Sequence, residues 1–175
     1  PTLGSDRAKS RELARTSPIA CGAINTNIDR VVGTGLALSA APNRHILGWT
    51  AEQALSWKHT VQAEFSLLSD SAEYDQAQTL NFDEQQALVV RAVLESGDCC
   101  TLMPDGERTA TMPYRLRLQV LEADRVGNPL GSMDTAQMAG GIKLDNGGAP
   151  VACHVYDQHP GGFFPGLGSK SLYSG

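Results

Sequence analysis

The pattern of apolar positions near the amino terminus predicts two consecutive helices. Residues 5–15 form a charged, mildly amphipathic stretch, and Ser17-Pro18 then suits a new helix start, with Ser at the N-cap and Pro in the first turn. The second helix is expected to run to about Val32, because its apolar residues fall on one face: Ala20, Ile24, Ile28 and Val31. Gly33 suits the left-handed position that ends a helix.

A short strand and a longer helix are expected next. Alternation over residues 35–40 predicts a strand with its leucines facing inward, and residues 42–49 are predicted to form a loop. Thr50 and Gln53 have the spacing of a capping box, which marks the start of a helix. One face of that helix carries apolar residues at steps of three and four, and we expect it to be core: Ala54, Trp57, Val61, Phe65 and Leu68.

A second capped helix follows and ends at a glycine. Asn81 and Glu84 repeat the capping-box spacing, and Gly97 is a typical helix terminator. The apolar residues between them are Phe82, Leu88, Val89, Ala92 and Val93.

After Gly97 the pattern changes from helical to alternating. Strands are predicted over residues 99–103 and 115–121, and residues 141–156 form a hairpin around Asn146-Gly147. In the second strand one face carries Leu116, Leu118 and Val120, and the other carries Arg117 and Gln119. Helices first and antiparallel strands second predict an α+β fold, in which several amino-terminal helices, the helix after Thr50 among them, cover a small sheet.

Composition and charge exclude several classes of function. The chain has 175 residues, 41% of them hydrophobic, with 18 glycines, 9 prolines and a net charge of −5. Such a balance argues against a surface that binds the outside of duplex DNA, because phosphate contacts need clustered Lys and Arg. The sequence has no signal peptide and no run of 18 apolar residues, so we expect neither secretion nor a membrane span. Because the chain begins with Pro1, we expect it to be a piece of a longer protein.

The cysteines offer one catalytic hypothesis, a small cysteine-dependent hydrolase that uses Cys99 or Cys100. Their charged neighbours in sequence are the carboxylates Glu95, Asp98 and Glu107, which raise a thiol pKa and oppose activation. Four cysteines without CxxC spacing predict a reducing compartment and no disulfide framework: Cys21, Cys99, Cys100 and Cys153. Packing in strands is the competing interpretation of the thiols.

Other candidate motifs predict no site. The four histidines lack the spacing of metal ligands and are expected to be surface or half-buried side chains: His45, His59, His154 and His159. Gly33-Thr34-Gly35 follows a helix and opens a strand, which is the reverse of a dinucleotide-binding loop. Residues 166–171 resemble a phosphate loop, but Ser169 interrupts the motif. Asp29-Arg30 and Asp124-Arg125 are expected to be exposed pairs worth under about 1 kcal/mol. We therefore predict no catalytic, cofactor-binding or metal-binding residue.

Three blocks of sequence, in order, resemble the lambda-type phage portal proteins. The first comprises Arg15-Thr16-Ser17-Pro18 and the Val-Val-Gly-x-Gly at residues 31–35. The second is the run at residues 116–126, which contains Glu-Ala-Asp-Arg, and the third is the hairpin at residues 140–155. Ser96-Gly97-Asp98 lies where the family tends to carry Gly-Glu before a strand. This sequence departs from the family pattern at Ser17, Lys143, Ala149 and Cys153, in place of Asn, Glu, Arg and Tyr.

The resemblance implies a structural function without cofactors. Family members are subunits of a dodecameric ring at the capsid vertex, through which double-stranded DNA passes without sequence-specific contacts during packaging and ejection. Their partners are capsid protein, terminase and head-tail adaptor proteins, with assembly in the host bacterial cytoplasm, final location in the virion, and no membrane. The resemblance also implies that residues 1–156 form the wing-like domain, and that a flexible Gly/Pro-rich segment, residues 157–175, leads toward stem and clip regions. An accessory interaction domain that forms no ring is the remaining alternative.

Overall fold

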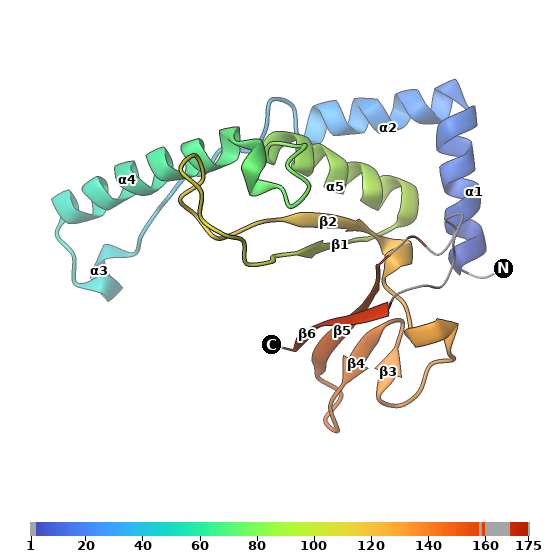
Figure 1. Cartoon of the computed structure of the whole chain (residues 1–175). Coiled ribbons are helices and arrows are strands. Elements are labelled where there is room, and N and C mark those ends of the chain that lie inside the picture. The colour runs from blue at the N-terminus through green and yellow to red at the C-terminus, as the bar shows by residue number, and fades with distance from the viewer. Residues whose placement is uncertain (1–2, 158, 160–168, 175) are drawn as a thin grey trace. The chain divides into compact units, whose positions relative to one another are not determined.

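The computed structural model describes residues 3–157, 159 and 169–174, and shows helices followed by small antiparallel sheets (Figure 1). The α+β class predicted from the sequence is confirmed. The chain divides into two compact units: unit 1 comprises residues 1–18, 92–100 and 121–175, and unit 2 comprises residues 19–91 and 101–120. Each unit is therefore assembled from segments that are far apart in sequence.

The helices begin and end close to the predicted positions. Helix α1 spans Leu3–Thr16, α2 spans Pro18–Val31, α4 spans Ala51–Asp70 and α5 spans Phe82–Ser96. Both capping boxes form: Thr50 and Gln53 bond each other's backbone N–H groups, and Asn81 and Glu84 do the same. Gly33 and Gly97 have positive φ angles of 57° and 88°, as helix-ending glycines do.

The predicted strand over residues 35–40 is wrong. This segment of unit 2 is extended but pairs with no strand, and its leucines, Leu36 and Leu38, are exposed. Side chains take the place of a neighbouring strand: the Leu36 N–H donates to Gln86 Oε1 at 3.0 Å, and Gln62 Nε2 donates to the Leu38 carbonyl at 2.8 Å. The loop expected over residues 42–49 contains a further short helix, α3 (Arg44–Leu47), whose N-terminus is capped by Asn43.

Helix α4 differs most from its predicted role. It was expected to bury one apolar face over a sheet, yet it has no buried residue. On that face Trp57 is 41% exposed, and Ala54, Val61, Phe65 and Leu68 are half-buried. Apolar side chains at helical spacing mark a face that favours burial but do not identify what covers it. The core assignment of this face is therefore only partly right: the face is half-buried, and Phe65 packs against Phe82.

The core of unit 2 lies around Tyr74, which follows α4 in a 3-10 turn, η1 (Ala72–Tyr74). Tyr74 is 2% exposed and makes an edge-on contact with Phe82, which in turn contacts Phe65. Asp75 is also buried, and its carboxylate accepts three hydrogen bonds from Thr79 and Leu80. These bonds offset the cost of burying its charge.

Strands β1 (Cys99–Leu102) and β2 (Gln119–Glu122) form a two-stranded sheet. Just before β2, exposed and buried residues alternate as the sequence predicts. The alternation is reversed, however: the apolar residue is exposed and the polar residue is buried. Leu116 is 42% exposed, whereas Arg117 is 6% exposed and donates hydrogen bonds to the carbonyls of Tyr114, Leu116 and Glu107. A buried guanidinium is tolerated here because backbone oxygens replace water around it.

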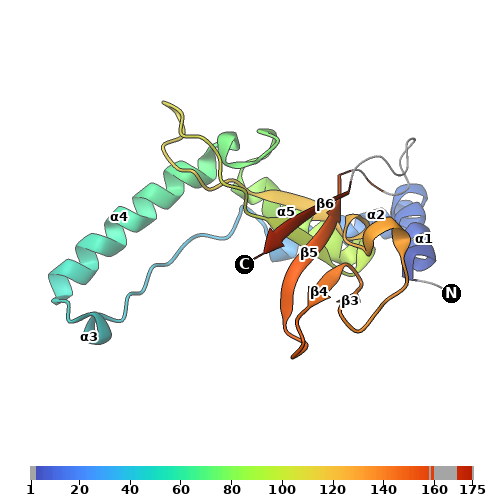
Figure 2. The ribbon, with the colours of Figure 1, turned by 60° about the horizontal axis from the view of Figure 1, so that its bottom comes forward.

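Unit 1 contains a four-stranded antiparallel sheet in the order β3-β4-β5-β6 (Figures 1 and 2). The strands are β3 (Met138–Ala139), β4 (Ile142–Leu144), β5 (Pro150–Tyr156) and β6 (Ser169–Ser174). The predicted hairpin is thus confirmed as β4 and β5, and Asp145 closes its turn by accepting from the N–H groups of Gly147 and Ala149. Where a flexible segment was expected, residues 169–174 pair with β5, while residues 158, 160–168 and 175 lie outside the described residues.

Two short 3-10 turns, η2 (Ala123–Arg125) and η3 (Pro129–Gly131), complete unit 1. A close backbone approach fixes their position next to the sheet. Gly141 has φ +84°, and a Cβ there would lie 2.6 Å from the Gly127 nitrogen, so only glycine fits. The Gly141 N–H donates to Asn128 Oδ1 at 2.7 Å in this buried corner.

Candidate functional site

Asp124, in the turn that follows β2, contacts three polar side chains of unit 1. Its side chain is 11% exposed, and the preceding Ala123 is buried. Burying a carboxylate is costly unless cations or hydrogen-bond donors face it. The residues around Asp124 provide both.

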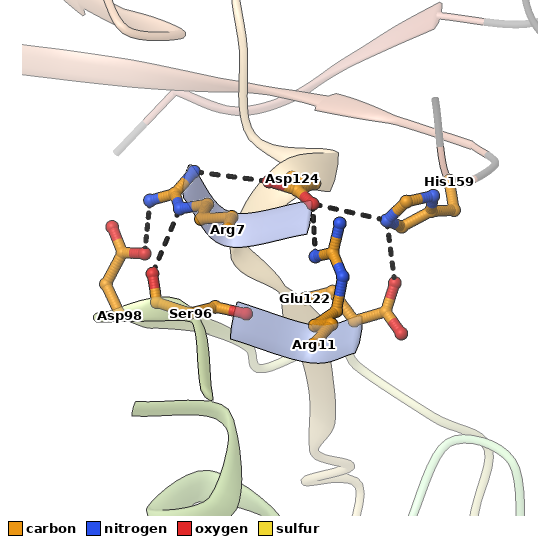
Figure 3. A network of polar contacts seen from close by, with 7 residues as sticks. All are labelled: Arg7, Arg11, Ser96, Asp98, Glu122, Asp124 and His159. Atoms are coloured by element: carbon orange, nitrogen blue, oxygen red, sulfur yellow. Dashed lines mark hydrogen bonds and ion pairs between the residues drawn. The ribbon is translucent and has the colours of Figure 1, made fainter. Parts of the chain in front are cut away.

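Two arginines of α1 face this carboxylate (Figure 3). Arg7 and Arg11 lie one helical turn apart, so their side chains leave the helix from the same face. Arg7 Nη1 lies 3.4 Å from Asp124 Oδ1, and Arg11 forms an ion pair with the other oxygen, Oδ2. The arrangement fixes α1 against the turn η2.

Arg7 also reaches the end of α5. Its Nε donates to the Ser96 carbonyl at 3.0 Å, and its Nη2 lies 2.5 Å from Asp98 Oδ1. The Arg7 side chain is 13% exposed, whereas that of Asp98 is 64% exposed. The contact with Asp98 is therefore well screened by water, and the bonds to Ser96 and Asp124 are the more sheltered ones.

His159 closes the cluster from the other side (Figure 3). Its Nε2 lies 3.4 Å from Asp124 Oδ2 and 3.5 Å from Glu122 Oε2. Burial by itself would raise the pKa of Asp124, but the hydrogen bond from Arg11 and the charges of Arg11, Arg7 and His159 outweigh it and lower that pKa below its usual value. Asp124 is consequently ionised at neutral pH.

Arg125, the neighbour of Asp124, contacts a different part of the unit. Its Nε donates to the Tyr156 carbonyl and its Nη2 to the Asp157 carbonyl, both at 2.9 Å. The sequence predicted that Asp124 and Arg125 form an exposed pair with each other. That prediction is wrong, because each residue binds a partner distant in sequence: Asp124 holds α1, and Arg125 holds the end of β5.

His154 is buried rather than half-buried or on the surface as predicted. It is 6% exposed, and its Nδ1 lies 2.7 Å from the Gly127 carbonyl. Its ring makes an edge-on contact with Tyr156, which lies on the same face of β5 and donates from its hydroxyl to the Asn128 carbonyl. The imidazole is thus part of the packing beside Gly127.

The cysteines proposed as nucleophiles are not activated. Burial raises the pKa of Cys99, and the nearby Cys100 and Asp98 raise it further. Burial also raises the pKa of Cys100, and the nearby Cys153 raises it further. A catalytic thiol needs a lowered pKa and a neighbouring base, so these shifts favour the packing interpretation over the hydrolase.

The geometry of the Asp124 cluster suits holding segments of the chain in place and not catalysing a reaction. Its carboxylate is shared among Arg7, Arg11 and His159, and these contacts join three segments of the chain. Among the residues that the structure describes, no group of three or more His, Cys, Asp or Glu side chains could hold a metal ion. Within the same residues, no helix combines the length and apolar character needed to cross a membrane.

Sequence reasoning missed the arginine partners of this cluster. Asp124 was noted only together with its neighbour, and Arg7 and Arg11 were noted only as part of a charged helix. The available signal was their spacing of four residues, which places two cations on one face of α1. Nothing local in the sequence indicates that a carboxylate more than a hundred residues later faces them.

Comparisons with known proteins place nearly all of the chain in one family. The family model described as "Phage portal protein, lambda family" matches residues 1–172. The portal protein of Escherichia phage N15 is 22% identical over 166 residues, which is 92% of this chain, and portal protein B of Escherichia phage lambda is 20% identical over 169 residues, or 94%. The chain spans 31% of the length of each of these relatives. The chain belongs to the lambda family of phage portal proteins.

Proposed function

We propose that this chain forms the wing-like part of a portal subunit, with residues 1–156 as the wing domain, and that the complete subunits assemble into a dodecameric ring. The ring serves as the conduit for DNA packaging and ejection and as the head-tail connection at the capsid vertex. The observation that carries the proposal is the family match over residues 1–172. The role is structural: the subunit supplies shape and interfaces and catalyses no reaction.

Exposed apolar side chains of α4 support lateral contacts between subunits. Leu55, Trp57 and Leu67 remain exposed within the chain and point to different sides of the helix, because their separations of two and ten residues do not follow the helical period. A ring is built from head-to-tail interfaces in which one surface of each subunit meets a different surface of its neighbour. We assign these exposed side chains of α4 to such interfaces.

The charge of the chain supports passage of DNA without tight binding. A net charge of −5 provides no excess of cations for the phosphate backbone. A conduit benefits from weak contacts, since strong phosphate binding would hold the duplex in place. In this proposal the ring contacts duplex DNA without reading its sequence, and its protein partners are capsid protein, terminase and head-tail adaptor proteins. The subunit assembles in the host bacterial cytoplasm and remains in the virion.

The test is electron microscopy of the complete reading frame that contains this segment. We expect rings of about twelve-fold symmetry with a central hole. A Leu67→Glu variant should reduce ring formation while leaving the circular dichroism spectrum unchanged, because Leu67 is 70% exposed. The matched control on the same helix is Glu52→Gln, which should form rings normally. Small, uniform particles without a hole from the unmodified protein would refute the proposal, and normal rings from Leu67→Glu would refute the assignment of this α4 side chain to an interface.

A further inference from the structure

Residues 36–41 of unit 2 form an extended segment between α2 and α3 that pairs with no described strand (Figure 1). Contacts with the rest of the unit hold this segment near both ends. Gly35, which precedes it, has φ +101°, and a Cβ there would overlap the carboxylate of Asp83 at the start of α5. Toward the other end, Ala40 is 8% exposed. The backbone of the segment is therefore held in place within unit 2.

One edge of this segment is bonded to side chains of two helices. The Leu36 N–H donates to Gln86 of α5, and the Leu38 carbonyl accepts from Gln62 of α4. In an extended chain the N–H and C=O of one residue point to the same edge, and those of the next residue point to the opposite edge. Both glutamine bonds therefore lie on the edge that the even-numbered residues of the segment share.

The opposite edge carries backbone groups that have no partner among the residues that the structure describes. Its N–H and C=O groups belong to Ala37, Ser39 and Ala41, and all three residues are exposed. A row of such groups, repeated at every second residue, is the feature to which an added strand forms its hydrogen bonds. This edge is therefore open for pairing, whereas the glutamine side chains occupy the other edge.

The composition of the segment leaves the open edge without the usual protection against pairing. Proteins commonly protect an exposed edge with charged side chains, especially Lys, or with Pro. Residues 31–43 include no charged residue, and the proline in this range, Pro42, follows the last residue of the open edge. A neutral edge also allows two copies of a chain with a net charge of −5 to meet without like charges at the contact. These features favour pairing with a second copy.

We propose that residues 37–41 are a docking edge to which an extended segment of a second copy of the subunit adds as a β-strand. The inference rests on the proposed ring, in which one head-to-tail contact repeats between neighbouring copies. The segment is bonded through Gln62 to α4, whose exposed side chains form the proposed subunit interfaces, so the edge continues that surface. Main-chain hydrogen bonds supply the binding, and a backbone already held by Gln62 and Gln86 loses little freedom when the strand adds.

The first test measures backbone amide hydrogen exchange by mass spectrometry in the complete subunit, before and after assembly. We expect the peptide that covers residues 36–41 to exchange at least about tenfold more slowly in rings than in unassembled subunits. Equal protection in the unassembled subunit would overturn the inference, because the added strand would then belong to the same copy. Rings in which this peptide exchanges as fast as before assembly would overturn the inference and leave the proposed function intact. A subunit that remains monomeric would overturn both.

Two proline substitutions make the test specific to one edge. Ser39→Pro removes an N–H from the open edge, whereas the matched control Leu38→Pro removes one from the opposite edge and keeps the carbonyl that Gln62 binds. We expect Ser39→Pro to raise the subunit concentration for half-maximal ring assembly at least about tenfold, and Leu38→Pro to change it less than about twofold.

Equal assembly of the two proline variants would overturn the assignment of the open edge. Circular dichroism spectra and urea midpoints of the unassembled variants establish that both are folded. The segment is exposed at Leu38 and Ser39, so we expect these midpoints to match that of the unmodified subunit.

Discussion

Replacing Asp124 by Asn removes the charge that holds α1 while keeping the size of the side chain. Asp124 faces Arg7 and Arg11, whose side chains are 13% and 31% exposed, and is itself 11% exposed. Exposed ion pairs contribute about 0–1 kcal/mol, and breaking a fully buried one costs about 3–5 kcal/mol. The exposures here lie between these cases, so we expect Asp124→Asn to lower the free energy of unfolding by about 2 kcal/mol.

The assay is urea unfolding followed by circular dichroism at neutral pH and low salt. The matched control is Asp6→Asn, also in unit 1, which removes a carboxylate that is 56% exposed and lies 3.8 Å from Lys9. We expect the control to change the free energy of unfolding by less than about 0.5 kcal/mol. A double-mutant cycle with Arg11→Gln isolates the energy of the pair from other effects of each substitution.

The pH dependence gives an independent check with a defined sign. The pKa of Asp124 is lower in the folded protein than in the unfolded chain. Its contribution to stability is therefore fully present above the unfolded pKa, about 3.9, and is lost as the pH falls through the folded value. The difference between the unmodified protein and Asp124→Asn should be largest near neutral pH and should shrink below about pH 4.

Two outcomes would refute the reasoning about this cluster. One is a loss in Asp124→Asn no larger than that of the Asp6→Asn control, which would mean that water screens the cluster as it does a surface pair. The other is a difference between the two proteins that stays constant down to about pH 2, because a carboxylate with a lowered pKa must lose its contribution on protonation.

Two further substitutions test the packing that surrounds the cluster and β2. Gly141→Ala should destabilise the protein by about 3 kcal/mol, because φ is +84° and the added Cβ would lie 2.6 Å from the Gly127 nitrogen. The control Gly4→Ala, in open space on α1, should not destabilise it. Equal urea midpoints for the two variants would contradict this prediction. Arg117→Met should lower the free energy of unfolding by about 2–3 kcal/mol, because it leaves three backbone carbonyls without their donor. Arg115→Met, at a side chain that is 60% exposed, should lower it by less than about 0.5 kcal/mol. Similar losses in the two variants would show that the burial of Arg117 is unimportant.

Local signals in the sequence determined where the helices and the hairpin lie. The capping boxes at Thr50 and Asn81 involve residues three positions apart, and Gly33 ends α2 through its own backbone conformation. The hairpin of β4 and β5 follows in the same way from alternation on either side of a turn. These features were predictable because their stabilising contacts are formed by near neighbours in the chain. The order of the helical and strand segments likewise determined the α+β class.

Tertiary structure alone decided which polar groups are buried and what each one binds. Arg117 looked like an outward-facing residue, and its burial depends on carbonyls of Glu107 and Tyr114 that converge only in the folded unit. Residues 35–40 alternate like a strand, but their backbone is bonded by glutamine side chains, because pairing depends on a neighbour and not on the segment itself. Asp124 likewise pairs with α1 only because the fold brings that helix next to it. A sequence specifies which groups need partners, whereas only the fold brings together residues more than a hundred positions apart.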